Sequence, residues 1–242
     1  MTAIYYRTGA FVFRKKDVFE ADRVFSVFSD EFGKLEVIGR AIRKITSKLR
    51  GGIEIFSLSE IEFVQGKNLK TLTDTVSLEK FGNIAQDPNK LEISGKIADV
   101  LDNFIKGQEK DELIFALLRD VFSKLNDAKL KTFGVQLVYH YFLWNFFSLA
   151  GYHPEIQKCA ACQMKLSPDI IYFSNKEGGI ICKNCSSSDI KAKKINSDIV
   201  KMLKLILKKD WHILSRLKVG DFSQKLLKEV SDNYYHYILP SH

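Results

Sequence analysis

Residues 21–50 read ADRVFSVFSDEFGKLEVIGRAIRKITSKLR, and two patterns follow one another along this stretch. The first alternates apolar and polar residues over 23–28 and 35–38, with a turn signal at 31–34 between them. A period of two is typical of half-buried β-strands, so these segments predict two strands joined by a turn. The second pattern, over residues 34–50, is a run of basic residues that predicts a charged loop after a strand.

Short runs of the same alternating kind flank this stretch, at residues 10–13, 53–56 and 58–64. Glycine and charged turn signals separate them, as at 14–17, 51–52 and 65–68. About five short strands at this spacing predict a small barrel of the OB type over residues 1–80.

Beyond residue 80 the apolar residues recur at helical spacing. Helices are expected over about 93–104, 113–125, 131–150, 197–206 and 223–238. Ser197-Asp198 and Ser223 are candidate N-caps, Gly151 is placed to stop the third helix, and Pro240 ends the last. The sequence therefore predicts an α+β protein with a five-stranded OB-fold barrel at 1–80 and a helical domain at 81–242.

The helix expected over 131–150 is apolar almost all round, and its segment 133–150 is long enough to be tested as a membrane span. Gln136, His140 and Asn145 lie within it, and such polar groups are costly in hydrocarbon. We expect a buried helix at the centre of a bundle.

All four cysteines of the chain fall in one motif, Cys159-x2-Cys162-x19-Cys182-x2-Cys185. Two knuckles of this kind supply four thiolates in a tetrahedron, the arrangement that structural zinc prefers. Residues 170–174 and 179–181 predict a hairpin, turned at 175–178, that brings the knuckles together. We expect a structural zinc ribbon inserted at about 155–190; a redox dithiol, an iron–sulfur cluster and disulfides are the alternatives.

Net charge is +8, from 37 Lys and Arg against 29 Asp and Glu, which fits a polyanion partner or an ordinary basic surface. The densest run in the strand region is 34–50, where Glu36 is the single acid. Its basic residues are Lys34, Arg40, Arg43, Lys44, Lys48 and Arg50. A loop of this kind on a barrel can reach nucleic-acid phosphates, and a charged loop on a basic protein is the alternative. Phe11, Phe13, Phe25 and Phe28 are candidates for stacking bases, although the alternation places some of them in the core.

A second basic run comprises Lys191, Lys193, Lys194, Lys201, Lys204, Lys208 and Lys209. Part of it lies one turn apart on a predicted helix, which indicates a solvated face, with a second polyanion contact as the alternative. No nucleotide-binding, nucleophile-elbow or metalloprotease motif is visible, and a metal-dependent hydrolase would need an open coordination position. We therefore expect no enzyme. The start of the chain carries no secretory signal, so a cytosolic location is expected.

Several short motifs follow one another in a recognisable order. They are EADR at 20–23, FSDEFGKL at 28–35, GRAIRK at 39–44, GYHP at 151–154, YFS at 172–174, GG at 178–179 and the two flanking cysteine pairs. In order and spacing the chain resembles the RecO family of bacterial DNA repair and recombination proteins.

The resemblance implies an OB-fold that binds single- and double-stranded DNA, and a helical domain carrying the cysteine motif. It implies a cytoplasmic, nucleoid-associated recombination mediator that anneals strands and, with RecR, helps load RecA onto DNA coated with single-stranded-DNA-binding protein. The basic residues of 34–50, together with Arg14 and Arg23, occupy the family's DNA-contact positions. Some family members lack the cysteines, which implies a structural zinc. The competing hypothesis is an RNA-binding or translation-associated module with a similar barrel and zinc ribbon.

Overall fold

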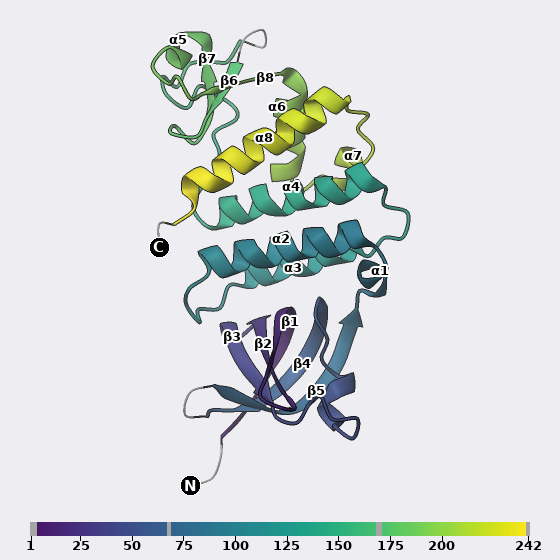
Figure 1. Cartoon of the computed structure of the whole chain (residues 1–242). Helices are drawn as coiled ribbons and strands as arrows, with labels where there is room; N and C mark the ends of the chain where they lie inside the picture. The colour runs from purple at the N-terminus through teal and green to yellow at the C-terminus, as the bar shows by residue number, and fades with distance from the viewer. Residues whose placement is uncertain (1–3, 67–68, 168–170, 241–242) are drawn as a thin grey trace. The chain divides into compact units, whose positions relative to one another are not determined.

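The computed structural model describes residues 4–66, 69–167 and 171–240. It divides into two compact units, Met1–Leu130 and Lys131–His242, each described here by itself. Figure 1 labels their helices and strands. The first unit contains five strands, which end at Lys80, and three helices that follow them.

Five strands of the first unit close into a barrel in the order β1-β2-β3-β5-β4, with β1 pairing β4. They are β1 (Tyr5–Val18), β2 (Asp22–Ser29), β3 (Gly33–Gly39), β4 (Ser57–Val64) and β5 (Lys70–Lys80). The β3–β5 pair is parallel and the others are antiparallel. This is a five-stranded OB barrel, so the predicted fold class is confirmed.

The strand expected at 53–56 is wrong, and β5 was not predicted. Ile53 is buried in the barrel core, but Phe56 has a φ of 57°, which turns the chain sharply before β4 begins. The fifth strand is instead Thr-rich, with most of its side chains exposed or half-buried. Its apolar alternation is therefore weak, which is why the sequence pattern missed it.

Both faces of the barrel wall near β1 and β2 are covered. Val12 and Phe25 point into the barrel core, whereas Phe11 lies outside that core and contacts the rings of Phe81 and Phe122 in a tilted arrangement. Phe13 and Phe28 are also buried. The four phenylalanines considered for base stacking are thus all core residues, and that expectation is corrected.

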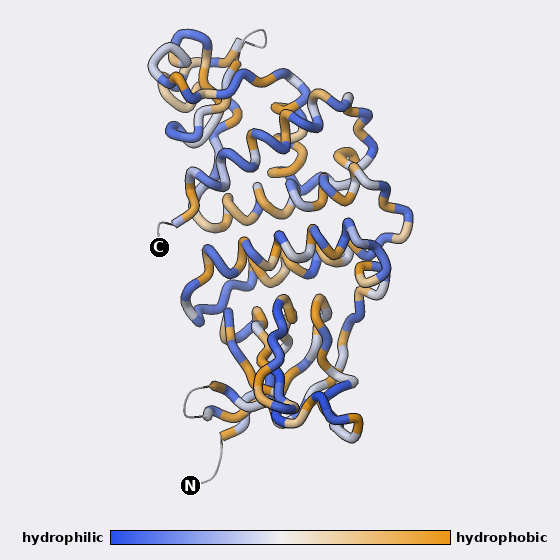
Figure 2. Tube along the Cα trace, viewed as in Figure 1, coloured by the Kyte–Doolittle hydropathy of each residue, from blue (hydrophilic) through white to orange (hydrophobic). Residues whose placement is uncertain are grey.

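Helices α1 (Gly82–Ala85), α2 (Pro88–Phe104) and α3 (Glu112–Leu125) complete the first unit. Asp87 and Asp111 begin α2 and α3 by accepting backbone N–H bonds at their first turns. Both helices pack on β1. Orange apolar and blue polar residues alternate along these elements in Figure 2, as amphipathic packing requires.

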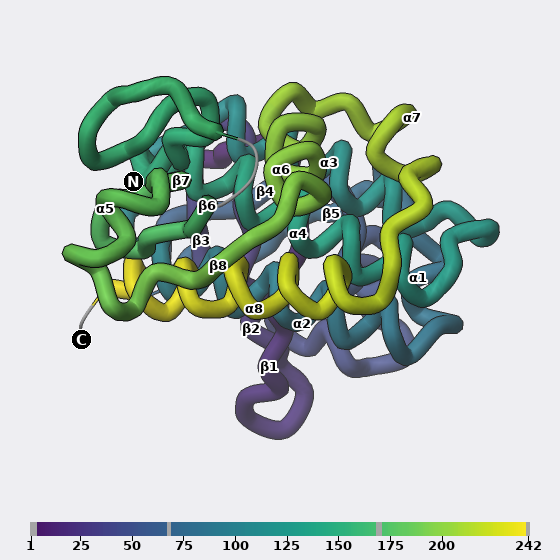
Figure 3. The backbone as a smooth tube through the Cα atoms, turned by 90° about the horizontal axis from the view of Figure 1, so that it is seen from above, coloured from purple at the N-terminus to yellow at the C-terminus, as the bar shows by residue number. Residues whose placement is uncertain are grey.

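The second unit is built on α4 (Thr132–Leu149), which packs against α6 (Ser197–Leu207) and α8 (Asp221–Ile238), with α7 (Trp211–Leu214) beside α6. Figure 3 shows these helices from above. The expected central, buried helix is confirmed, since α4 is buried on nearly every face. In the described part of the chain, no helix is both long and apolar enough to cross a membrane.

Polar groups mark the ends and the interior of these helices. Gly151 has a φ of 90°, and the Tyr152 N–H bonds to the Phe147 carbonyl at 2.8 Å, so α4 stops where predicted. The predicted caps are corrected: Asn196 caps α6 by accepting from the Ile199 N–H, and Gly220 precedes α8. Helix α8 therefore begins at Asp221, before Ser223, whereas α6 begins at Ser197 as expected.

The cysteine segment of the second unit forms a small sheet in the order β7-β6-β8. The predicted hairpin is confirmed as β6 (Ile171–Ser174) and β7 (Gly179–Cys182), while Ile170 lies outside the described residues. Helix α5 (Lys183–Ser186) and strand β8 (Lys193–Ile195) follow. Strand β8, which contains part of the second basic run, was not predicted.

Candidate nucleic-acid interface and metal centre

The segment 40–53 that follows β3 is a loop held by side chains that pack into the barrel core. The 3-10 turn η1 (Lys48–Gly51) lies near its end. Ile42 and Ile53 are buried in the barrel core, and Leu49 packs against the same cluster. Two buried apolar side chains and the half-buried Leu49 leave this loop little room to move. The charged residues between them therefore project from a held backbone.

Asp22 of β2 fastens the start of this loop. Its Oδ1 accepts from the Ala41 N–H at 2.7 Å and its Oδ2 pairs with Arg40 Nη1 at 2.7 Å. Those two bonds hold the pKa of the Asp22 carboxyl below its usual value, and the bond from the Ala41 N–H makes the larger contribution. The bond also supports Ala41, whose φ of 50° is uncommon for a residue with a side chain.

Strand β5 fastens the end of the loop. Thr75 Oγ1 donates to the Leu49 carbonyl at 2.9 Å. At Gly52 a Cβ atom would lie 2.2 Å from the Thr75 carbonyl oxygen, so only glycine permits this close approach. The basic loop is thus clamped at both ends by the barrel itself.

The basic residues that the sequence predicted for this loop all have exposed side chains. They are Arg40, Arg43, Lys44, Lys48 and Arg50. Arg23, on β2, is half-buried. Within the described residues Lys44, Lys48 and Arg50 form no ion pair, so their charge is available to an external anion.

Arg14 and Lys34 do not join this group, because they meet carboxylates of α2. Arg14 pairs with Asp99 and, at 3.0 Å through Nε, with Asp102. Lys34 Nζ lies 2.9 Å from Asp102 and donates to the Ile105 carbonyl at 3.2 Å. Lys34 and Arg14 therefore tie α2 to the barrel.

The four cysteines meet at one point in the second unit. Their Sγ atoms all lie within 4.8 Å of one another, and the sulfurs of Cys162 and Cys182 are 3.9 Å apart. A zinc tetrahedron with bonds of about 2.3 Å has sulfur–sulfur edges of about 3.8 Å. The four thiols therefore fit a four-coordinate metal ion. His153 bonds to Ser148 at 2.6 Å and is not part of the group.

Hydrogen bonds within the cluster separate the acidities of its thiols. Burial raises the pKa of Cys159, but backbone N–H donors from Cys162, Cys182 and Ala161 outweigh it and bring that pKa down to about 6. The pKa of Cys185 is raised to about 12, first by its bonds to the Cys182 and Cys162 sulfurs. The N–H groups that stabilise a Cys159 thiolate are those that support a metal-bound thiolate.

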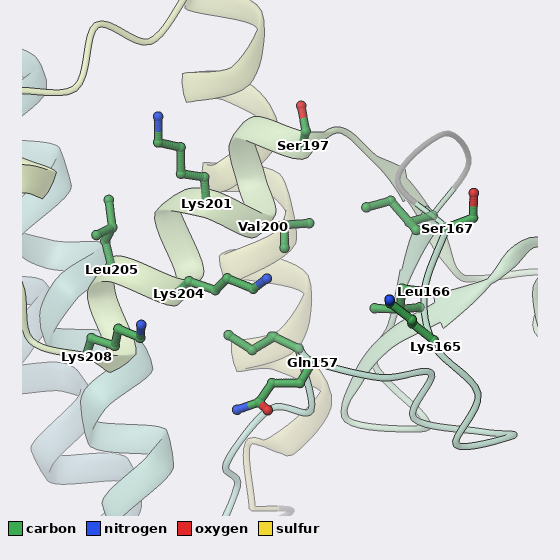
Figure 4. A pocket seen from close by; sticks show the side chains of 12 residues that line it. Gln157, Lys165, Leu166, Ser167, Ser197, Val200, Lys201, Lys204, Leu205 and Lys208 are labelled. Carbon is green, nitrogen blue, oxygen red and sulfur yellow. The ribbon is translucent and has the colours of Figure 1, made fainter.

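A second feature of this unit was not predicted as a site. A pocket of about 590 Å³ lies between the cysteine segment and α6. Figure 4 shows Lys165 on one side, with Lys201, Lys204 and Lys208 on the helix. Its apolar lining is Ile156, Leu166, Ile171, Val200 and Leu205. The helical spacing of the lysines was visible in the sequence, but the facing wall comes from residues about 40 positions earlier and could not be inferred from that spacing.

Together these observations define a class: a protein with an OB barrel that presents a clamped basic loop, and a helical unit that carries four cysteines positioned to hold a metal ion. Two family models match the chain, "Recombination protein O N terminal" over residues 1–81 and "Recombination protein O C terminal" over residues 85–242. The chain belongs to the RecO family.

Curated relatives agree with this assignment. A protein named DNA repair protein RecO from Dehalococcoides mccartyi is 30% identical over 218 residues, covering 89% of this chain and 83% of its own length. Proteins of the same name from Desulforamulus reducens and Alkaliphilus metalliredigens are 25% and 26% identical. Those two matches cover 97% and 94% of this chain, and 90% and 91% of the relatives.

Proposed function

We propose that this protein is a recombination mediator in DNA repair that binds single- and double-stranded DNA and anneals complementary strands without catalysing a covalent reaction. The observation that carries the proposal is the clamped loop with its exposed cations on an OB barrel. The names of the relatives support the role in repair. The proposed site of action is the bacterial cytoplasm, at the nucleoid.

The proposed DNA contacts are Arg40, Arg43, Lys44, Lys48 and Arg50 of the loop and Arg23 beside it. Arg14 and Lys34 are secondary contacts, because they lie on β1 and β3, outside the loop, and pair with carboxylates of α2. Cations at fixed positions release counterions from the DNA backbone when they bind phosphates. Neutralising two strands at once lowers their mutual repulsion, so pairing can begin. Annealing of this kind needs no nucleotide hydrolysis.

Zinc is the metal we propose for the cysteine cluster, held by Cys159, Cys162, Cys182 and Cys185. Four thiolates fill a tetrahedral zinc ion and leave no position for substrate, which supports a structural role. Small segments of this kind gain folding free energy from the metal.

RecR and single-stranded-DNA-binding protein are the proposed partners, with RecA loading as the outcome of their joint action. The resemblance to the family supports this. In the second unit, the lysine-rimmed pocket with an apolar lining offers a surface suited to an acidic protein segment that also carries apolar side chains.

A salt titration of DNA binding tests the proposed interface. The double variant Lys44→Gln/Lys48→Gln removes two unpaired cations and leaves the interior of the barrel unchanged. For single strands the slope of log affinity against log salt falls by about 0.7 for each phosphate that is no longer neutralised, so the double variant should be shallower by about 1.4. Strand annealing should slow in parallel.

Lys228→Gln is the matched control, since Lys228 lies on α8 and pairs with Asp232. Its salt slope should equal that of the unaltered protein. Equal slopes for the double variant and the unaltered protein would remove the loop from the interface. Tighter binding of RNA than of single-stranded DNA by about tenfold would favour the RNA-binding hypothesis instead.

A further inference from the structure

A small pocket of about 190 Å³ opens on the barrel beside the basic loop. Its polar lining is formed by three arginines, Arg23 of β2, Arg43 of the loop and Arg50 of η1. Its apolar wall is formed by three buried side chains, Phe25, Ile42 and Ile53. The sequence analysis named all three arginines as candidate DNA contacts, but it did not show that they line one cavity.

Asp17 holds two of these arginines in place. Its Oδ1 accepts from Arg23 Nε at 2.6 Å, and its Oδ2 lies 3.5 Å from Arg43 Nε. Arg43 Nη1 also donates to the Glu20 carbonyl at 3.4 Å. Asp17 engages the Nε atoms and the Glu20 carbonyl engages Arg43 Nη1, so the Nη groups of Arg23 and Nη2 of Arg43 remain as donors. The hydrogen bond from Arg23 is the largest influence on the Asp17 carboxylate and keeps its pKa below the usual value, although burial acts in the opposite direction. The carboxylate therefore stays ionised.

Of the three arginines, Arg50 has the fewest interactions within the described part of the chain. In the part of the chain that the structure describes, no carboxylate pairs with it, and its backbone is fixed by the turn in which its N–H bonds to the Ser47 carbonyl. A guanidinium on a fixed backbone is well suited to a bidentate bond with phosphate oxygens.

The net charge of the residues around this pocket favours a terminal phosphate group over an internal phosphodiester. Three arginines and Asp17 sum to 3 − 1 = +2. A phosphomonoester carries about −1.5 to −2 at neutral pH, whereas each internal phosphodiester of a strand carries about −1. The cavity is also smaller than the roughly 300–1,000 Å³ of pockets that enclose drug-sized ligands, so it fits a phosphate group and not a whole nucleotide.

We propose that this pocket binds the terminal phosphate of a DNA strand, and so gives the barrel a preference for phosphorylated strand ends. The inference rests on the proposed function, because it assumes that the barrel binds DNA. Such a pocket would distinguish strand ends from internal positions, which phosphate contacts along a DNA backbone do not do.

Fluorescence anisotropy with three oligonucleotides of one sequence tests the inference. One carries a 5′-phosphate, one a 3′-phosphate and one hydroxyl groups at both ends. We expect one or both phosphorylated oligonucleotides to bind about five- to twentyfold more tightly than the unphosphorylated one, as charge-assisted bidentate bonds allow. The 5′ and 3′ arms show which end is preferred.

Arg50→Gln and, separately, Arg43→Gln should reduce this ratio to near one. The matched control is Lys44→Gln, a neighbouring cation that does not line the pocket. It should weaken all three oligonucleotides alike and keep the ratio.

Equal binding of the three oligonucleotides by the unaltered protein would overturn the inference while leaving DNA binding by the barrel intact. Failure to bind any of them would overturn the proposed function as well. A ratio that survives both arginine variants would place the end-binding site elsewhere and also overturn the assignment.

Discussion

Arg14 and Lys34 contact carboxylates of α2, whereas Lys44 and Lys48 extend from a clamped loop without an ion pair among the described residues. All four are basic residues of the same sequence region, and composition alone treats them alike. An external phosphate must displace a carboxylate from the first pair but only water from the second. The structure thus divides the basic residues of the barrel into those that pair with α2 and those that we propose to bind DNA.

Arg14→Ala should therefore affect stability more than DNA affinity. Removing two partly exposed ion pairs costs about 1 kcal/mol of the free energy of unfolding. Urea denaturation and DNA titration of the same preparation measure both quantities. Lys44→Ala is the comparison, with lowered affinity and unchanged stability expected. If Arg14→Ala weakens DNA binding as strongly as Lys44→Ala while unfolding normally, Arg14 is a direct contact.

Asn145 is a second residue whose role depends on its surroundings. Its Nδ2 donates to the Tyr141 carbonyl at 2.8 Å and to the Ile206 carbonyl at 3.0 Å, joining α4 to α6. Asn145→Ala should lower the free energy of unfolding by about 1–3 kcal/mol, because the buried Ile206 acceptor is then left without this donor. Gln136→Ala, on the same helix but half-buried, should cost less in the same denaturation experiment. Equal destabilisation by the two variants would show that Asn145 contributes only packing.

At the scale of elements, the basic loop depends on an acidic residue of its neighbour strand. Removing Asp22 removes a negative charge near the proposed DNA contacts, which by simple electrostatics would strengthen binding. It also releases the Ala41 N–H and Arg40, and a loop that must be ordered on binding pays additional conformational entropy. We judge the loss of order to be the larger effect.

Asp22→Ala should accordingly weaken DNA binding by about three- to tenfold at fixed salt. Glu36→Ala is the matched control, because it removes an exposed carboxylate from the same basic region without releasing the loop. Its affinity should be unchanged or higher. Stronger binding by Asp22→Ala would mean that charge outweighs loop order here.

Elements were predictable from the sequence where their signal is local. The long helices α2, α3, α4, α6 and α8, the hairpin of β6 and β7 and the cysteine cluster follow from periodicity and spacing, whereas the short helices α1, α5 and α7 were not predicted. Strand β5 was missed because its alternation is weak, and the burial of Phe13 and Phe28 depends on what covers the barrel wall from outside. The arginine pocket depends on Asp17, which lies 26 residues before Arg43, and no sequence period links the two.

At the scale of the whole molecule, the proposed DNA interface and the metal centre belong to different compact units of one chain. The basic loop is fastened by barrel residues alone, as the bonds of Asp22 and Thr75 show. The ribbon is held by contacts within the second unit, where Phe173 of β6 packs on Trp144 of α4 and Tyr234 of α8, and the proposed zinc would add to them. Loss of the metal should therefore remain a local event.

Removing the metal tests this separation. The double variant Cys162→Ser/Cys185→Ser replaces one thiolate of each knuckle, so zinc analysis should fall from a single ion per chain to almost none. The ribbon should become sensitive to protease near residues 155–190 because part of its folding free energy comes from the ion. DNA affinity should stay within about twofold of the unaltered protein, since each fastening bond of the loop remains. Affinity that falls in step with zinc content would make the ribbon part of the DNA interface, and the division of labour between the two units would be wrong.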